Sequence, residues 1–215
     1  FGIPLITAKI VKGGRILEPD EFIPFEDYDE RMQRGIPNAG DVVVTTEAPL
    51  GEVAQLDDRK LSVGQRLITL RGKTGLLDNT YLKFLMMSEY VQNQLAARAT
   101  GTTVIGIKQE ELRKVTLVIP PFVEQRAIAE ILGALDDKIE LNRQTNQTLE
   151  TLARTLFREK MSTVVEKGSI LEFANLLSGG TPSTTEESYW NGNIEWISAK
   201  DVSNTDGVFL LNTEK

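Results

Sequence analysis

The sequence predicts an α+β protein: a mixed α/β domain, then a long coiled-coil-type helix, then the start of a second, related domain. Over residues 1–119, short runs rich in β-branched residues alternate with turn residues and one helical pattern. A heptad pattern follows without a break. Residues 194–202 then resemble residues 3–11 at a constant offset of 191. A repeat with that period is a whole domain rather than a solenoid unit.

The first strands are expected at 3–11 and 41–46, where Val, Ile and Thr are frequent. Residues 61–70 alternate enough between apolar and polar positions to predict one or two further strands. Because of the repeat, residues 194–202 should form a strand at the place that 3–11 occupies in the first domain. Turns are expected where glycine and proline gather, at Gly13-Gly14, Gly35, Pro37-Asn38 and Gly40.

A helix is expected over 79–98, because apolar residues recur there at steps of three and four. The Gly/Thr-rich segment 99–103 should end this helix. Residues 115–119 are rich in β-branched side chains and are followed by Pro120-Pro121, so they are expected to form a closing strand.

The long helix is expected from Phe122 to about Met161, and its length of about 58 Å follows from a rise of 1.5 Å per residue. Its seam positions are separated by alternating steps of four and three, which is typical of a coiled coil. Asparagines within such a seam lower stability but select register and partner. The alternative is a helix that packs on its own domain. The seam consists of Ile128, Leu132, Leu135, Ile139, Asn142, Asn146, Leu149, Ala153 and Leu156.

These patterns predict three parts, at 1–119, 120–165 and 166–215. The composition lowers the expectation of catalysis within them. The 215 residues include no cysteine and no histidine, which excludes thiolate metal sites, thiol nucleophiles and the commonest general base. No apolar run is long enough to span a membrane, so we expect a cytoplasmic protein without a membrane partner.

The charge distribution is uneven. A formal net charge of −7 argues against a nucleic-acid partner, since such proteins usually carry a basic surface. However, residues 59–73 contain five basic residues and no acid, whereas 18–30 contain seven acids and no base. A local basic face is therefore expected around 59–73.

Four motifs follow one another along the chain: GDVV with APLG within 40–51, TGTT with IKQ within 100–109, a PPFVEQRAIA helix start at 120–129, and LSGGTPS at 177–183. Together they resemble those of the DNA-specificity subunits of type I restriction-modification enzymes. Residues 40–51 and 100–109 resemble the interior of a target recognition domain in that family. PPFVEQRAIA at 120–129 with LDDKIELN at 135–142 resembles the central conserved helix. The segment 177–202, with LSGGTPS, YWNG and IEWISAKDV, resembles the opening of another recognition domain.

The resemblance implies a DNA-recognition subunit with no catalytic activity of its own. In this family two target recognition domains each read one half of a bipartite site, and helical spacers hold them apart and dock two methyltransferase subunits. The expected partners are double-stranded DNA, methyltransferase subunits and, through them, the restriction subunit; self-association through the spacer helix is also expected. No cofactor is expected, because S-adenosylmethionine and ATP belong to partner chains. The chain would be a fragment that lacks the start of its first recognition domain, most of its second and the second spacer helix.

The candidate DNA contacts are polar or basic residues in or near these motifs. Lys9 and Lys200 are equivalent in the repeat and could contact phosphate, or could be solvated lysines at strand ends. Gln109 could pair bidentately with adenine, and Arg66 could contact guanine or phosphate; a helix-initiating turn and a surface strand are the alternatives. The full set is Lys9, Lys12, Gln65, Arg66, Thr102, Thr103, Lys108, Gln109, Thr181, Ser183, Tyr189 and Lys200.

The candidate docking residues are the seam positions other than Ala153, together with Glu124 and Gln125, which we interpret as a capping and docking feature at the helix start. No metal site is expected: Asp136, Asp137 and Glu140 share one helix, so a solvated face or a subunit contact is favoured. A second hypothesis keeps the same architecture but makes the protein a coiled-coil adaptor for other proteins, which the net charge of −7 supports.

Overall fold

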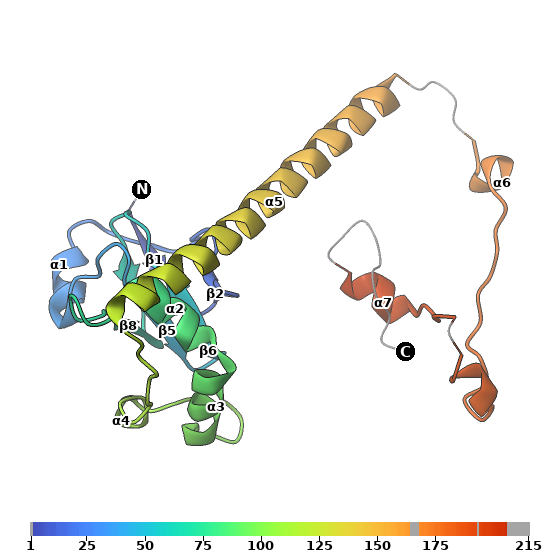
Figure 1. Ribbon diagram of the computed structural model, residues 1–215. Helices are drawn as coiled ribbons and strands as arrows, with labels where there is room; N and C mark the ends of the chain where they lie inside the picture. The colour runs from blue at the N-terminus through green and yellow to red at the C-terminus, as the bar shows by residue number, and fades with distance from the viewer. Residues whose placement is uncertain (1, 164–167, 193, 206–215) are drawn as a thin grey trace. The chain divides into compact units, whose positions relative to one another are not determined.

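The computed structural model describes residues 2–163, 168–192 and 194–205, and the chain divides into two compact units, Phe1–Thr155 and Leu156–Lys215 (Figure 1). The first unit contains every strand of the described residues. The expected fold class is confirmed, because a mixed sheet-and-helix domain is followed by one long helix. Residues 164–167, 193 and 206–215, which belong to the predicted third part or its junction, lie outside the described residues.

One small sheet is built around β1 (Ile3–Ile6), which is antiparallel to β4 (Phe22–Ile23) and parallel to β7 (Ser62–Val63). The strand expected over 3–11 is therefore only partly correct. Its chain leaves the sheet in a turn at 8–10, where the backbone N–H of Ile10 donates to the carbonyl of Thr7 at 3.2 Å. It then enters β2 (Val11–Lys12), which forms a hairpin with β3 (Arg15–Ile16).

The second three-stranded sheet has β5 (Val42–Thr46) between β6 (Leu50–Gln55) and β8 (Leu67–Leu70), antiparallel to both. The strands expected at 41–46 and within 61–70 are confirmed. Successive side chains of β5 point to opposite faces, and both faces are covered. Val42 and Val44 face a cluster with the helices, whereas Val43 packs with Ile6 and Leu61 on the β1 side. A strand buried on both faces explains the unbroken valine run in the sequence.

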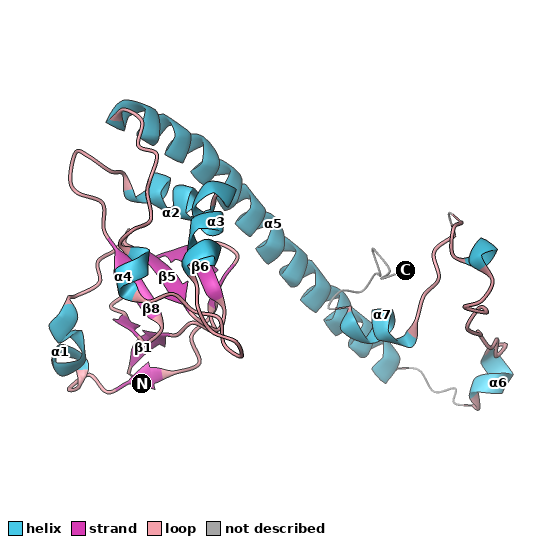
Figure 2. Ribbon diagram, turned by 90° about the horizontal axis from the view of Figure 1, so that it is seen from below, coloured by secondary structure: helices cyan, strands magenta, loops and turns pink. Residues whose placement is uncertain are grey.

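The helix expected over 79–98 is divided at Ser88 into α2 (Asn79–Met87) and α3 (Glu89–Arg98). The Ser88 side chain accepts a hydrogen bond from the backbone N–H of Val91, so it caps the second helix after the first has ended. Both helices pack on β5 and β6 through the cluster that includes Leu82, Met86 and Leu95 (Figure 2). The short helices of this unit are α1 (Tyr28–Arg31), η1 (Met32–Arg34) and α4 (Gln109–Leu112).

The strand expected over 115–119 is absent from the described structure, although the segment lies against the helices. Side chains satisfy its backbone instead of a neighbouring strand. Gln94 accepts from the N–H of Thr116 and donates to its carbonyl, both at 3.0 Å, and the Tyr81 hydroxyl donates to the carbonyl of Val118 at 3.0 Å. These bonds replace a β-ladder, which is why strand-like composition did not produce a strand.

Helix α5 (Phe122–Ser162) is continuous, as expected from the heptad pattern. Its first turns pack on the first unit, where Gln125 and Ala129 are buried. Gln125 accepts from the N–H of Asp78 at 2.9 Å and donates to the carbonyls of Leu76 and Pro120 at 3.0 and 2.8 Å. The helix is thus anchored through a polar side chain inside the protein.

In the second unit, the described residues form α6 (Ile170–Phe173), η2 (Glu187–Tyr189) and α7 (Ala199–Asn204). The expectation of a strand over 194–202 is therefore wrong. Ser198 and Asp201 form a capping box, in which each side chain bonds the backbone N–H of the other residue, and this starts a helix. Residues 3–6 have two partner strands, whereas no strand is described in this unit to pair with 194–198.

Candidate nucleic-acid interface

A concave groove in the first unit gathers polar side chains from segments far apart in the sequence. Its volume is about 1220 Å³, and its walls come from η1 and the following loop, the end of β5, the turn between β7 and β8, β8 itself and the start of α4. The fold brings together three of the candidate DNA contacts predicted from the sequence, namely Gln65, Arg66 and Gln109. The polar side chains on its walls include Arg31, Gln33, Gln65, Arg66, Thr69, Arg71 and Gln109.

The end of β5 holds these segments together. The backbone N–H of Thr46 donates to the carbonyl of Arg66, and the carbonyl of Thr46 accepts from the N–H of Ile107, both at 2.9 Å. Glu47 and Gly106 add an isolated β-bridge beside them. One residue therefore fixes the β7–β8 turn on one side and the segment leading into α4 on the other, so Gln65 and Gln109 line one groove.

Arg66 has an unusual backbone conformation at the tip of its turn. Its φ of 69° lies in the left-handed region that side-chain-bearing residues rarely adopt. Its side chain is 52% exposed, and its Nε lies 2.8 Å from Oε1 of Glu47. The guanidinium is therefore held by a carboxylate while half of its surface remains open to solvent.

Arg71 is bound differently. Its Nε and Nη2 donate to the two carboxylate oxygens of Asp41, each at 2.7 Å, and Nη2 also donates to the carbonyl of Ile36 at 3.0 Å. Burial raises the pKa of the Asp41 carboxyl, but hydrogen bonds from Arg71 and from the N–H of Asn38 outweigh this effect and leave it below its ordinary value. This pair fastens the 36–38 loop to the sheet, so Arg71 builds the groove wall.

Sequence reasoning did not identify Arg31 or Gln33 as groove residues. Both lie in the short helical segment before Gly35, where there is too little periodicity to assign a face. A search for Arg and Gln near the predicted turns would have found them, because these are the side chains that pair bidentately with bases.

The predicted basic face is weaker than the sequence suggests. Arg59 is ion-paired with Asp57 at 2.7 Å, and the Lys60 ammonium lies 4.1 Å from the centre of the Tyr28 ring. Arg66 and Arg71 have the carboxylate partners described above. Four of the five basic residues in 59–73 are thus already engaged, so hydrogen-bonding groups rather than a strong positive field characterise the groove.

Five other candidates of the first unit do not line the groove. Lys108 is the exposed N-cap residue of α4, next to Gln109. Thr102 and Thr103 are exposed in a loop whose ends pair through Thr100 and Gly106. Lys9 lies in the turn before β2, with its ammonium 3.6 Å from Glu21, and exposed Lys12 lies in β2. Their roles in DNA binding stay predictions.

The remaining candidates belong to the second unit, where all four are exposed: Thr181, Ser183, Tyr189 and Lys200. The carbonyl of Ser183 accepts from the indole N–H of Trp190 at 3.0 Å. The Trp190 ring meets that of Trp196 edge-to-face with centroids 5.7 Å apart. The contacts proposed for these four residues stay predictions.

The candidate docking residues on α5 fall into two groups. Gln125 is fully buried and bonded within the chain, so it is an internal anchor of the helix start, and a role for it in docking stays a prediction. Glu124, Asn142 and Asn146 are exposed, and Leu132 is half-buried. The large apolar seam residues are between 38% and 58% exposed: Ile128, Leu135, Ile139, Leu149 and Leu156. Most of the seam therefore does not pack on the first unit.

A charge cluster fixes α5 further along its length. Asp136 is ion-paired with Lys83, whose side chain is 10% exposed, and lies 3.5 Å from Arg15. Arg15 is also ion-paired with Glu140. Asp136 and Glu140 are thus paired with basic residues of their own unit, and their side chains stay 27% and 40% exposed, so a subunit contact at this face stays a prediction. We call these four residues the α5 clamp.

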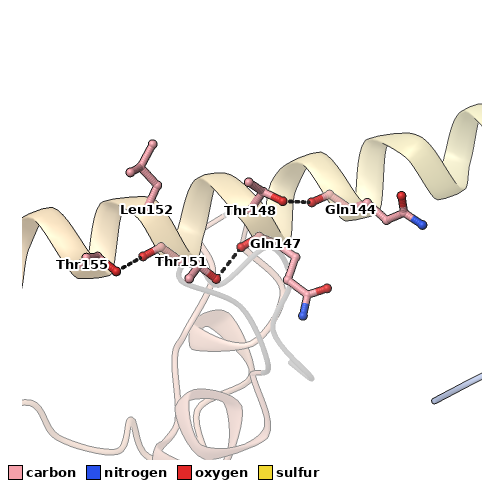
Figure 3. Close-up of a pocket in the computed structure, with 6 residues that line it drawn as sticks. All are labelled: Gln144, Gln147, Thr148, Thr151, Leu152 and Thr155. Carbon is pink, nitrogen blue, oxygen red and sulfur yellow. Dashed lines mark hydrogen bonds between the residues drawn. The ribbon is translucent and has the colours of Figure 1, made fainter. Parts of the chain in front are cut away.

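A shallow hollow lies on the exposed face of α5 and is lined by six residues of this one helix: Gln144, Gln147, Thr148, Thr151, Leu152 and Thr155. Figure 3 shows the hydroxyls of Thr148, Thr151 and Thr155 bonded to backbone carbonyls four residues earlier, at 2.8–2.9 Å. Because the hydroxyls already have acceptors and a single helix lines the hollow, which is open to solvent, we do not interpret it as a ligand site. Among the described residues, no group of three or more acidic side chains could hold a metal ion, and no helix is long and apolar enough to cross a membrane.

Comparison with known proteins connects this geometry to a family. The family model described as "Type I restriction modification DNA specificity domain" matches residues 2–151. The chain is similar to the type I restriction enzyme MjaVIII specificity subunit of Methanocaldococcus jannaschii, with 27% identity over 157 residues, which cover 69% of this chain and 36% of that protein. It is also similar to the HindI specificity subunit of Haemophilus influenzae, with 31% identity over 98 residues, or 45% of this chain and 21% of that protein.

A solved structure agrees on the fold. The HsdS subunit of Thermoanaerobacter tengcongensis matches with a TM-score of 0.51 and 21% identity, covering 72% of this chain and 40% of that chain. At this identity the likeness concerns the fold alone. The chain spans about a third of the length of its MjaVIII relative, 36%.

Proposed function

Because the chain belongs to the family of type I restriction-modification DNA specificity domains, we propose that its first unit reads one half of a bipartite DNA site. The observation that carries this proposal is the groove in which Gln65, Arg66 and Gln109 converge. Glutamine amides can pair with the N6/N7 edge of adenine, and an arginine can pair with O6 and N7 of guanine. The groove offers both chemistries within one concave surface.

The proposed domain organisation is a target recognition domain over 1–119, a spacer helix over 120–165 and the start of a second recognition domain over 166–215. The exposed seam of α5 supports the spacer role, since a row of large apolar residues on a helix is usually covered by another helix. In the whole protein, the covering elements would be a second spacer helix and the methyltransferase subunits.

The proposed subunit selects the site while partner chains carry out the chemistry. A chain without histidine or cysteine lacks the commonest general base and the thiol nucleophile. The methyltransferase partner would bring S-adenosylmethionine, and the restriction subunit would join through that partner. Lys9, Lys12, Thr102, Thr103 and Lys108 are proposed as contacts to the DNA backbone near the groove or beyond it.

A coiled-coil adaptor for other proteins is the second candidate, supported by the net charge of −7 and by the exposed seam. The salt dependence of binding distinguishes the DNA-recognition hypothesis from the adaptor hypothesis. DNA binding that depends on phosphate contacts weakens steeply with salt, with a log–log slope of about −0.9 per contact. An adaptor that binds through an apolar seam would not show this dependence.

The test is a fluorescence-anisotropy titration of the complete protein with its methyltransferase partner, using matched and mismatched half-sites at several salt concentrations. Lys108→Ala should weaken binding to both DNAs alike and make the salt slope shallower by about 0.9. Gln109→Ala should instead reduce the discrimination between them, by about 1–3 kcal/mol. Asp137→Ala, an exposed carboxylate on α5, is the control. If Lys108 and Gln109 variants both bind as wild type does, the reading surface lies on another face.

A further inference from the structure

We propose that Arg66 recognises a guanine through its two terminal nitrogens and that Glu47 is the residue that positions it. This inference rests on the proposed DNA-recognition function and deepens it, because it assigns one base to one side chain. It starts from the ion pair in which Oε1 of Glu47 lies 2.8 Å from Nε of Arg66.

Backbone contacts hold both Arg66 and Glu47 in place. The Arg66 carbonyl accepts from the N–H of Thr46 at 2.9 Å, which keeps the residue in its left-handed conformation with φ of 69°. Glu47 forms a β-bridge with Gly106. A Cβ at position 106 would lie 2.9 Å from Cβ of Glu47 and 3.3 Å from its Oε2, so only glycine lets the backbone lie so close to this carboxylate. Backbone strain of the kind seen at Arg66 is concentrated at functional sites.

The contact with Glu47 favours a base over a phosphate. The carboxylate lies against the Nε side of the guanidinium, and no hydrogen bond engages the terminal nitrogens of Arg66 within the described residues. Two parallel N–H donors from these nitrogens match O6 and N7 of guanine. A phosphate approaching the same edge would be repelled by the nearby negative charge of Glu47, whereas the acceptor edge of guanine carries no net charge.

Arg71 lines the same groove, but its partners differ from those of Arg66. Asp41 occupies its Nε and Nη2, and the carbonyl of Ile36 takes a further bond from Nη2. The Asp41 side chain is 1% exposed, so this pair is part of the folded wall. Of these two groove arginines, only Arg66 has both a fixed carboxylate and an open bidentate edge.

The test uses the complete protein bound to its methyltransferase partner. Its target is first determined with a randomised oligonucleotide library, and binding is then measured with duplexes in which single guanines are replaced by 7-deazaguanine, which lacks the N7 acceptor. We expect one guanine position at which this replacement weakens wild-type binding. The same position should lose its preference for guanine by about 5- to 150-fold in Arg66→Ala, the range for a good bidentate pair. In that variant, 7-deazaguanine should cause no further loss.

Two more variants separate positioning from folding. Arg66→Gly removes the side chain and suits the left-handed backbone, so it should fold at least as well as wild type while losing the same preference. Glu47→Gln should reduce the guanine preference at that position and make the salt slope steeper by up to about 0.9, because the released guanidinium can then reach a phosphate. A merely structural role for Glu47 would leave the salt slope unchanged.

The failures of the two proposals are distinguishable. If wild type binds no DNA duplex from the library, both are overturned. If wild type binds a defined sequence but Arg66→Ala weakens all sequences equally and makes the salt slope shallower, Arg66 contacts phosphate and the guanine assignment is wrong. If Arg66 variants lose the preference but Glu47→Gln keeps it with an unchanged salt slope, the positioning role of Glu47 is wrong.

Discussion

Replacing Gln125 by leucine should detach the start of α5 from the first unit. The side chain is fully buried and forms three hydrogen bonds with backbone groups of residues 76, 78 and 120. Leucine has a similar volume but no polar atom, so Gln125→Leu would leave one N–H and two carbonyls without their partner. The glutamine therefore acts as a polar anchor between the loop before α2 and the first turn of α5.

The expected loss in the free energy of unfolding follows from these three hydrogen bonds. A net contribution of about 0.5–1.5 kcal/mol per hydrogen bond, and a larger cost for each buried group that stays unsatisfied, gives a loss of about 2–5 kcal/mol. This is a substantial part of a typical domain stability of about 5–15 kcal/mol. With a urea dependence of about 2 kcal/mol per molar, the unfolding midpoint should fall by about 1–2.5 M.

The assay is urea unfolding of the 215-residue chain followed by circular dichroism, with Arg126→Ala as the matched control on the exposed side of the same turn. That control should change stability by no more than about 0.5 kcal/mol. Hydrogen exchange over 122–132 should also become faster in Gln125→Leu. Equal midpoints for the two variants would show that the three bonds do not anchor the helix.

The remaining predictions concern the clamp and the seam. Asp136→Asn should destabilise the first unit by about 1–3 kcal/mol in urea unfolding, because it leaves the nearly buried Lys83 without its carboxylate, whereas exposed Asp137→Asn should have little effect. Burial raises the pKa of Asp136, but Lys83 and Arg15 lower it below its ordinary value. The clamp should therefore stabilise wild type fully above about pH 4 and lose this effect as the pH falls through the folded-state pKa, a dependence that Asp136→Asn should lack. Self-association through the seam predicts a light-scattering mass above that of a monomer, reduced to the monomer by Ile139→Lys; a monomeric wild type would rule it out.

Local patterns predicted the elements that depend on local chemistry. The valine run of β5 and the heptads of α5 both became the expected elements, since period and composition decide such cases. The division at Ser88 was also readable in principle, because a serine followed by Glu89 is a helix-start signal inside an otherwise continuous apolar pattern.

Long-range contacts decided the elements that were predicted wrongly. Residues 115–119 have strand-like composition, yet the side chains of Gln94 and Tyr81 bind their backbone groups. Residues 194–202 resemble 3–11, yet a capping box starts a helix there. Sequence similarity carries a preference for a strand, but a strand also needs neighbours to pair with.

The groove could be predicted only as separate residues. Gln65 and Gln109 were chosen from different motifs, and their convergence depends on the two backbone hydrogen bonds of Thr46. The partners of Arg66 and Asp136 lie 19 and 53 positions away, where no helical or strand period relates them. Counting charges along the sequence therefore overestimated the basic face around 59–73. It also could not predict the ion pairs of Asp136 and Glu140, because a count of charges does not show which of them lie next to each other in the fold.

The two faces of α5 have a geometric consequence for any second helix. Gln125, Ala129 and Asp136 face the first unit, whereas Leu135 and Leu149 belong to the exposed seam. At 3.6 residues per turn, these two stripes lie roughly a third of a turn apart around the helix. A helix packed into the seam would therefore lie beside the first unit rather than on the opposite side of α5. The clamp and Gln125 fix the direction in which α5 leaves its domain, so they would also fix the direction of any partner helix that follows the seam.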